Sequence, residues 1–275
     1  MRWKQYAPGA VSTKYVAFTH DPTNNYNYTW WKETHPTWIL YRCDRKTPAF
    51  KCFPPAPCDP PLPLDITNPD VVQFQMDNGV LPAKKEGYKG IAWDNFNLED
   101  SIRACGHFDA AGEWVAMYNG TNETIFPDGR AQYEKDVIEW TNTIRAKSHA
   151  VGMLMIPNYQ PSVSCKIKDG GYICAGGWNS SSVFAVGNGT DGALDECGFT
   201  GCSSGLTLGT QWENKLKFAL NQQHHGRSYY SINEWGKWSG HWGPSSHHSP
   251  DIPLAVHAWV RWLCCTVVHT NMKLS

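Results

Sequence analysis

The stretch GIAWDNF, at Gly90–Phe96, joins a short apolar run to an acid, an amide and an aromatic ring. A short apolar run bounded by turn residues predicts a buried strand. Burying a charge without a partner is costly, so a carboxylate at the end of such a strand requires an explanation. Asp94 and Asn95 would serve in an ordinary turn, because Asx side chains bond to nearby backbone groups. The alternative is a polar site at the end of the strand.

Similar apolar runs recur along the chain, separated by polar stretches with helical spacing, and this alternation is typical of an α/β protein. The predicted strands are Tyr15–Thr19, Trp38–Arg42, Leu62–Ile66, Lys89–Trp93, Gly152–Ile156, Gly192–Leu194 and Ser228–Ile232. Seven strands are one short of a closed (β/α)8 barrel, and a 275-residue chain is ordinary for one barrel of about 250 residues. We therefore expect an α/β fold with one domain over residues 1–275, a TIM (β/α)8-type barrel.

Three segments between the strands have helical spacing. The first begins at Asn68-Pro69, a capping residue followed by proline at the first helical position, and Pro82 is expected to kink or end it. The second and third are Gln132–His149 and Trp212–Asn221, each with one apolar face. These faces comprise Tyr133, Val137, Trp140 and Ile144 in the second helix, and Trp212, Leu216, Ala219 and Leu220 in the third. We expect each helix to cover a parallel strand.

Composition and motifs exclude several classes of function. The chain has 24 basic and 25 acidic side chains, so it has no global positive field that would attract nucleic acid. The most apolar segment, Ile252–Val268, is interrupted by His257 and Arg261, and no segment reaches the ~20 apolar residues of a membrane span. The sequence has no HExxH-like metal-ligand spacing, no Rossmann motif and no P-loop, so we expect neither a metal nor a cofactor.

Ten cysteines without CxxC pairs or a Cys/His ligand series indicate disulfides made in an oxidising compartment. Three pairs bracket turn sequences and are candidate loop crosslinks: Cys52 with Cys58, Cys165 with Cys174, and Cys197 with Cys202. Sequons for N-glycosylation occur at Asn27, Asn119, Asn122, Asn179 and Asn188. These features predict a secreted, disulfide-containing glycoprotein, although residues 1–18 have no apolar core of the length that a signal peptide needs.

Four of the predicted strands end in acids, amides or aromatic residues. The residues at these ends are Asp94-Asn95, Asn158-Tyr159, Asp195-Glu196 and Glu234-Trp235. In a parallel α/β barrel the carboxyl ends of all strands open on the same face, which is where catalytic side chains lie. The recurrence at four strands therefore favours one shared polar pocket over four unrelated turns.

Five segments resemble the glycosyl-hydrolase TIM-barrel family related to endo-α-1,4-polygalactosaminidase. They are PLDITNPDVVQFQ, GYKGIAWDNF, GMLMIPNY, TDGALDECGFT and SYYSINEW, and the match as a whole covers roughly Tyr15 to Trp235. The resemblance implies a barrel that cleaves glycosidic bonds, with the fourth-strand acid at Asp94 and the sixth-strand acid at Glu196. By the same comparison Tyr15–Thr19 is the third strand. The barrel is then expected to be incomplete at the N-terminus and at the last strand.

Glycoside hydrolysis commonly uses two carboxyl groups, one protonated and one ionised. We assign Asp94 the ionised role, because Asn95 and Asn158 can donate hydrogen bonds to its carboxylate, and Glu196 the role of general acid. The reverse allocation stays open, and Glu234 is a third candidate for either role.

The remaining site residues are predicted to bind a poly- or oligosaccharide substrate. They are Asn95, Asn158, Tyr159, Asp195, Glu234 and Trp235. The alternative function is that of a catalytically inactive carbohydrate-binding barrel, which would carry acids and aromatic residues at the same strand ends.

Overall fold

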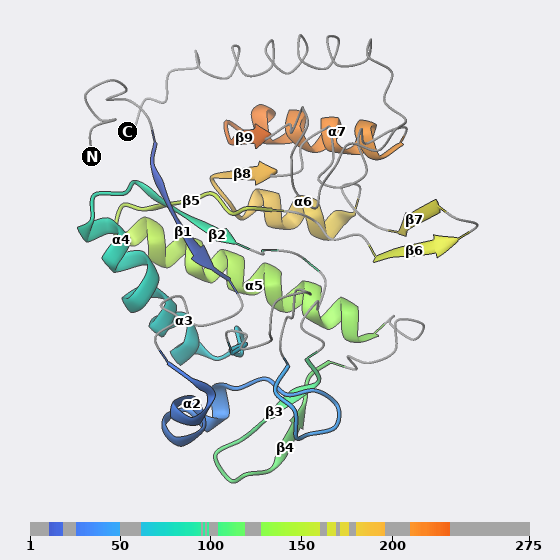
Figure 1. Cartoon of the computed structure of the whole chain (residues 1–275). Coiled ribbons are helices and arrows are strands. Elements are labelled where there is room, and N and C mark those ends of the chain that lie inside the picture. The colour runs from blue at the N-terminus through green and yellow to red at the C-terminus, as the bar shows by residue number, and fades with distance from the viewer. Residues whose placement is uncertain are drawn as a thin grey trace, which may run out of the picture.

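The computed structural model describes residues 11–18, 26–49, 62–94, 96, 98, 104–118, 128–159, 164–168, 171–175, 180–195 and 210–231. In these residues short parallel strands alternate with helices, which is a mixed α/β arrangement (Figure 1). The parallel strands are β1 (Thr13–Ala17), β2 (Gly90–Asp94), β5 (Leu154–Met155), β8 (Gly192–Asp195) and β9 (Ser228–Ser231).

The parallel strands lie side by side in chain order. Strands β1, β2 and β5 form one sheet, and β8 pairs with β9. A parallel bridge between Asn158 and Leu194 joins the two groups, with the Tyr159 amide donating to the Leu194 carbonyl at 2.8 Å. The described strands do not close into a barrel, so the TIM-type barrel stays a prediction.

The predicted strands around β2, β5, β8 and β9 are confirmed, and β1 covers the start of the predicted Tyr15–Thr19. The predicted strands Trp38–Arg42 and Leu62–Ile66 are wrong, because Ile39 and Leu64 form only an isolated antiparallel bridge. Residues 39–42 follow a 3-10 turn, η1 (Pro36–Trp38). The two segments divide between the cores: Leu40 and Ile66 pack into the main one, whereas a second hydrophobic cluster takes Ile39, Tyr41, Leu62 and Leu64.

The helix predicted after Asn68 begins where expected, as α3 (Pro69–Gln75), and the Asn68 carboxamide oxygen accepts a hydrogen bond from the Asp70 amide at 2.9 Å. It does not end before Pro82. It continues through a π turn, η2 (Met76–Val80), into α4 (Leu81–Lys85). Proline removes one donor of the α-helical ladder and its ring crowds the preceding turn. The wider π turn, in which the Leu81 amide donates to the Met76 carbonyl, accommodates this defect.

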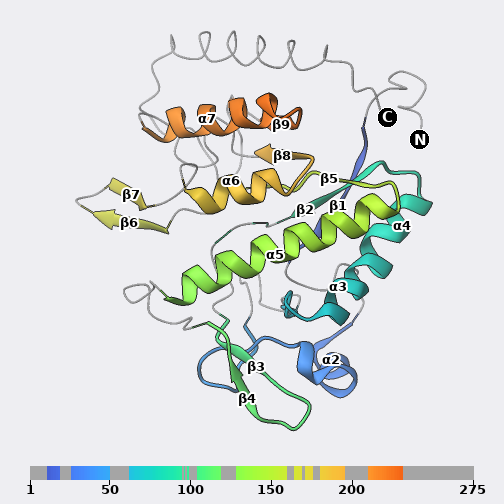
Figure 2. The ribbon, with the colours of Figure 1, turned by 180° about the vertical axis from the view of Figure 1, so that it is seen from behind.

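Three further helices follow the later strands: α5 (Asp128–Ala150), α6 (Ser181–Asn188) and α7 (Thr210–His224). Helix α5 contacts η2 and α6, and α6 contacts α7, so the helices lie beside one another in chain order (Figures 1 and 2). The predicted apolar face of α5 is confirmed. Its members Tyr133, Val137, Trp140 and Ile144 are all buried.

The buried face of α7 differs from the predicted one. Ala219 is buried as expected, but Leu220 is 47% exposed. Lys215 and Phe218 are buried in its place, and Leu216 is half-buried. The apolar pattern therefore predicted the wrong buried face for α7. A hydrophobic pattern cannot show that a lysine is buried because it pairs with a buried acid.

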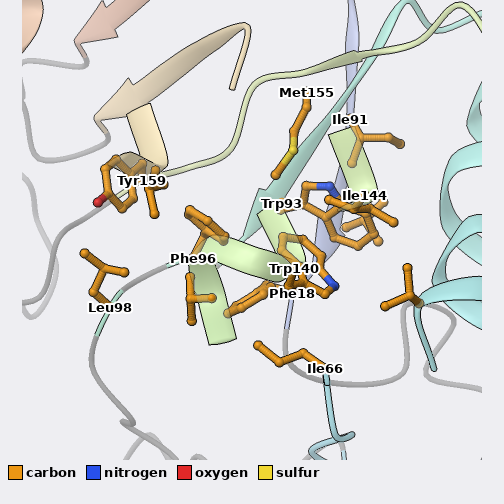
Figure 3. Close-up of a cluster of buried hydrophobic side chains, with 14 of the residues drawn as sticks. Phe18, Ile66, Ile91, Trp93, Phe96, Leu98, Trp140, Ile144, Met155 and Tyr159 are labelled. Carbon is orange, nitrogen blue, oxygen red and sulfur yellow. The ribbon is translucent and has the colours of Figure 1, made fainter. Parts of the chain in front are cut away.

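The main core is built around Trp140 of α5. Its ring centroid lies 4.6 Å from that of Phe18 and 5.2 Å from that of Trp93, and Phe96 packs against both Phe18 and Trp140 (Figure 3). The indole nitrogen of Trp140 donates to the Gln75 side-chain oxygen at 2.8 Å, and the Gln75 nitrogen donates to the Phe18 carbonyl at 2.8 Å. One buried amide thus links α3, α5 and the end of β1.

The second hydrophobic cluster lies between α2 (Tyr28–Thr34), the start of α3 and the hairpin of β3 (Gly106–Phe108) and β4 (Trp114–Ala116). A disulfide between Cys43 and Cys105, which the sequence did not predict, anchors this hairpin. The predicted Cys165–Cys174 crosslink stays a prediction, although the backbone of the hairpin β6 (Ser164–Lys168) and β7 (Gly171–Ala175) places these residues directly opposite each other.

Asp65, in the LDITNP segment, has a structural role. One carboxylate oxygen accepts hydrogen bonds from the amide and the hydroxyl of Thr67, at 2.9 and 2.7 Å. The other lies 2.9 Å from Nδ1 of His107 on β3. Because Asp65 is buried, these partners offset the cost of desolvating its charge. They also hold the β3–β4 hairpin against the segment before α3.

The orientation of α7 can be tested with two truncations. Phe218→Ala removes a fully buried ring and is expected to lower the free energy of unfolding by about 3–5 kcal/mol. Leu220→Ala removes an exposed side chain and should change that free energy by no more than about 0.5 kcal/mol. Urea unfolding followed by circular dichroism measures both. Equal losses in the two variants would contradict the observed orientation.

Candidate functional site

Three polar side chains from adjacent strands meet at the carboxyl edge of the sheet. The side-chain nitrogen of Asn158 donates to one carboxylate oxygen of Asp94 at 3.2 Å and also to the hydroxyl of Tyr15. Asn158 is buried, Asp94 is half-buried and Tyr15 is 49% exposed. We call Tyr15, Asp94 and Asn158 the Asp94 cluster.

The strand register brings this cluster together. Ala17 of β1 is aligned with Asp94 of β2, and the Phe18 amide donates to the Asp94 carbonyl at 3.1 Å. On the other side of β2, the Asn158 amide donates to the Trp93 carbonyl at 2.9 Å. Because the three strands run in parallel, their carboxyl ends lie at one edge of the sheet.

Side-chain alternation directs the cluster away from the helices. Trp93 packs against Trp140 of α5, so its side chain lies on the helix-covered face. Successive side chains of a strand point to opposite faces, and Asp94 therefore points to the other face. Tyr15 is aligned with Ala92 and lies on that same face. The cluster thus presents a carboxylate, an amide and a phenol on the face that α5 does not cover.

Asp195, at the end of β8, lies on the opposite, helix-covered face. Its carboxylate is 3.0 Å from the ammonium of Lys215 on α7 and accepts a hydrogen bond from the Tyr229 hydroxyl at 2.8 Å. Burial, and after it the Asp195 charge, raises the pKa of Tyr229 well above its ordinary value, so the phenol stays protonated and donates. With 1% of its surface exposed, Asp195 has the contacts of a structural ion pair, which argues against contact with a substrate.

Tyr159 is also directed into the core. Its ring is fully buried and packs near Phe96 and Phe218, with ring centroids 5.4 and 5.9 Å away. Burial, followed by the charge of Glu134, raises the pKa of Tyr159 well above its ordinary value, so the hydroxyl is neutral. This environment argues against sugar stacking by Tyr159.

Of the predicted site residues, the structure brings Asp94 and Asn158 together and places Asp195 and Tyr159 on the helix side. The others, Asn95, Glu196, Glu234 and Trp235, lie outside the described residues, and their roles stay predictions. Sequence reasoning missed Tyr15. Because Tyr15 precedes the buried Val16 in a strand, alternation could have indicated that Tyr15 points away from the core. The sequence did not show that the strand of Tyr15 is the neighbour of β2.

Within the described ranges, no group of three or more His, Cys, Asp and Glu side chains is arranged to hold a metal ion. None of the helices in these ranges has the length and apolar character needed to cross a membrane.

These features define an α/β protein with consecutive parallel strands and a polar cluster at their carboxyl edge. The sequence matches no protein-family model and no curated protein. Among solved structures it is similar to the spore cortex-lytic enzyme SleL of Bacillus megaterium QM B1551, with 14% identity and a TM-score of 0.36. The match covers 71% of this chain and 38% of the SleL chain. Similarity at this level does not support an inference about fold or function.

The structural role of Asp195 can be tested by removing its cation. Lys215→Met leaves a buried carboxylate without its partner and is expected to lower the free energy of unfolding by about 3–5 kcal/mol. The double variant Asp195→Asn/Lys215→Met retains an acceptor for Tyr229. Its free energy of unfolding should fall by less than that of Lys215→Met alone. Urea unfolding of both single variants and the double variant measures the coupling, expected at about 0.5–3 kcal/mol. Additive losses would show that the two charges do not interact.

Proposed function

We propose that this protein is a glycoside hydrolase that cleaves O-glycosidic bonds of a poly- or oligosaccharide, with Asp94 as one of its two catalytic carboxyl groups. The observation that supports this most directly is the hydrogen bond from Asn158 to Asp94 at the carboxyl edge of the described strands, where Asp94 is half-buried. The resemblance of the GIAWDNF region to the polygalactosaminidase-related barrels independently favours the same residue.

Asp94 serves as the ionised carboxyl group in this proposal. An ionised carboxylate only accepts hydrogen bonds, so the amide donor of Asn158 suits it. Because the Asn158 nitrogen also contacts the Tyr15 hydroxyl, the two neighbours hold the amide in one orientation. Asp94 then acts as the nucleophile or as the base that activates water.

Glu196 serves as the second carboxyl group. Asp195 is unsuited to this role, because its carboxylate is buried against Lys215 on the helix-covered face. The resemblance to the polygalactosaminidase-related barrels implies a sixth-strand acid at Glu196, the residue after Asp195. Glu196 is thus our candidate for the general acid that protonates the leaving oxygen.

The proposed scaffold for this site is a TIM-type barrel. Two observations support it: the five parallel strands follow one another in chain order, and η2, α5, α6 and α7 also contact one another in chain order. In a doubly wound sheet the strand order would reverse at a switch point, whereas barrel strands continue in sequence.

A carbohydrate-binding barrel without catalysis is the second candidate. The observation that favours it is that the Asp94 cluster, within the described residues, contains a single carboxylate. An amide, a phenol and one carboxylate can bind sugar hydroxyls without cleaving a bond.

A polysaccharide panel that includes amino-sugar polymers distinguishes the two candidates. Wild-type protein should release reducing ends from at least one polymer, and Asp94→Asn and Glu196→Gln should each lower kcat by about 10²–10⁴-fold. Glu234→Gln, with its predicted substrate-binding role, should mainly raise KM. Loss of turnover in Glu234→Gln alone would contradict the assigned pair. Binding of a polymer by the wild type without any release would favour the binding barrel.

The Tyr15 hydroxyl is expected to position Asn158 and, through it, Asp94. Tyr15→Phe keeps the ring and should lower kcat by about 2- to 10-fold, the worth of one hydrogen bond of roughly 0.5–1.5 kcal/mol. Tyr26→Phe, at an exposed tyrosine of the α2 segment, is the control and should not change kcat. Equal kinetics in the two variants would exclude a role for the hydroxyl in orienting the cluster.

A further inference from the structure

The segment that leads into α2 carries a sequon with an exposed surface. In Asn27-Tyr28-Thr29 the asparagine and the threonine are both exposed. The Asn27 side-chain oxygen accepts a hydrogen bond from the Trp30 amide at 2.9 Å and so caps the helix. The cap uses only the oxygen, and no described residue accepts a hydrogen bond from the Asn27 side-chain nitrogen. That nitrogen is the atom to which an N-linked glycan is attached.

The sequon at Asn188, the other one whose asparagine is described, differs in the folded chain. Thr190 is buried, and its hydroxyl donates to the Gly187 carbonyl at 3.1 Å. The Asn188 side-chain oxygen accepts from the Arg227 guanidinium at 3.0 Å. The folded structure therefore hides the hydroxyl of this sequon, whereas it leaves both Asn27 and Thr29 exposed.

Aromatic residues stand on both sides of Asn27 in the sequence. Tyr26 stacks on Trp30 with ring centroids 3.8 Å apart and an angle of 16° between the planes. Trp30 is half-buried, and Tyr26 is 38% exposed although it is a large apolar ring. Flat aromatic faces with polar edges suit packing against sugar rings. A sugar attached to the residue after Tyr26 would cover apolar surface that the protein itself leaves exposed.

The disulfide is an independent observation about the same part of the molecule. Cys43 follows η1 and is joined to Cys105, next to β3. Disulfides form and persist in oxidising compartments such as the lumen of the secretory pathway. N-linked glycans are added in that lumen, so a chain that acquires this disulfide there also meets the glycosylation machinery.

We propose that Asn27 is an N-glycosylation site and that the first sugar of its glycan packs on the Tyr26–Trp30 pair. The co-reactant is an oligosaccharide carried on a lipid pyrophosphate. The Asn27 side-chain nitrogen attacks C1 of the first sugar, the bond from C1 to the pyrophosphate oxygen breaks, the lipid pyrophosphate leaves, and the nitrogen loses one of its two protons. The carboxamide oxygen is unchanged, so the helix cap to Trp30 is retained. This proposal does not depend on the proposed glycosidase activity.

Site occupancy is tested on the full chain secreted from eukaryotic cells, by mass spectrometry of the peptide that contains Asn27. The wild type and Thr29→Ser should both carry a glycan there, because serine preserves the sequon. Thr29→Ala, which leaves the cap intact, and Asn27→Asp, which supplies an equivalent capping oxygen, should carry none. An unmodified Asn27 in the secreted wild type would overturn the proposal.

Packing of the sugar is tested through the thermal midpoint. The glycosylated wild type should unfold about 2–4 °C above Asn27→Asp, a shift that corresponds to about 1 kcal/mol for a domain of this size. Both proteins keep the cap and any glycans at the other sequons, so the difference reports Asn27 alone. In a Tyr26→Ala background the same pair should differ by less than half as much. An unchanged difference in that background would show that the sugar does not pack on the ring pair.

Discussion

The contact between Trp93 of β2 and Trp140 of α5 determines which way the end of β2 faces. Both rings are buried, and their centroids are 5.2 Å apart. Once Trp93 is held against the helix, the alternation of a strand turns Asp94 to the other face. The hydrogen bonds through Gln75 hold Trp140 in place, so the same buried amide that joins α3 to β1 also sets the direction of the candidate catalytic acid.

A second constraint acts at the end of β8. The Asp195 carboxylate is on the helix-covered face, where an unpaired charge would be costly, and Lys215 of α7 supplies the partner. This pair explains why α7 buries a lysine while Leu220 remains at the surface. It also distinguishes two acids that look equivalent in the sequence. Asp195 is buried in an ion pair with Lys215, whereas Asp94 is half-buried at the carboxyl edge of β2.

The segment LDITNP carries part of the family resemblance, yet its polar residues have structural roles. Asp65 and Asn68 are both accounted for by local hydrogen bonds, one anchoring His107 of the β3–β4 hairpin and the other capping α3. The Cys43–Cys105 disulfide and the Asp65–His107 contact attach the β3–β4 hairpin to the segments that build the second hydrophobic cluster. That part of the molecule is stabilised by a disulfide and by aromatic packing, and it lies outside the repeating strand-helix pattern.

The sequence by itself determined the local features: the strands β2, β5, β8 and β9, the cap at Asn68, the buried face of α5, and the polar residues at the strand ends. Each of these follows from periodicity or from a side chain bonding to its own backbone neighbours. Tertiary structure alone decided that Tyr15 joins Asp94 and Asn158, that Asp195 turns away toward Lys215, and that Cys43 pairs with Cys105. These choices depend on which strand lies beside which and on which face a helix covers. Such relations arise only when distant segments pack, because a buried charge or ring takes the partner that the whole fold places next to it.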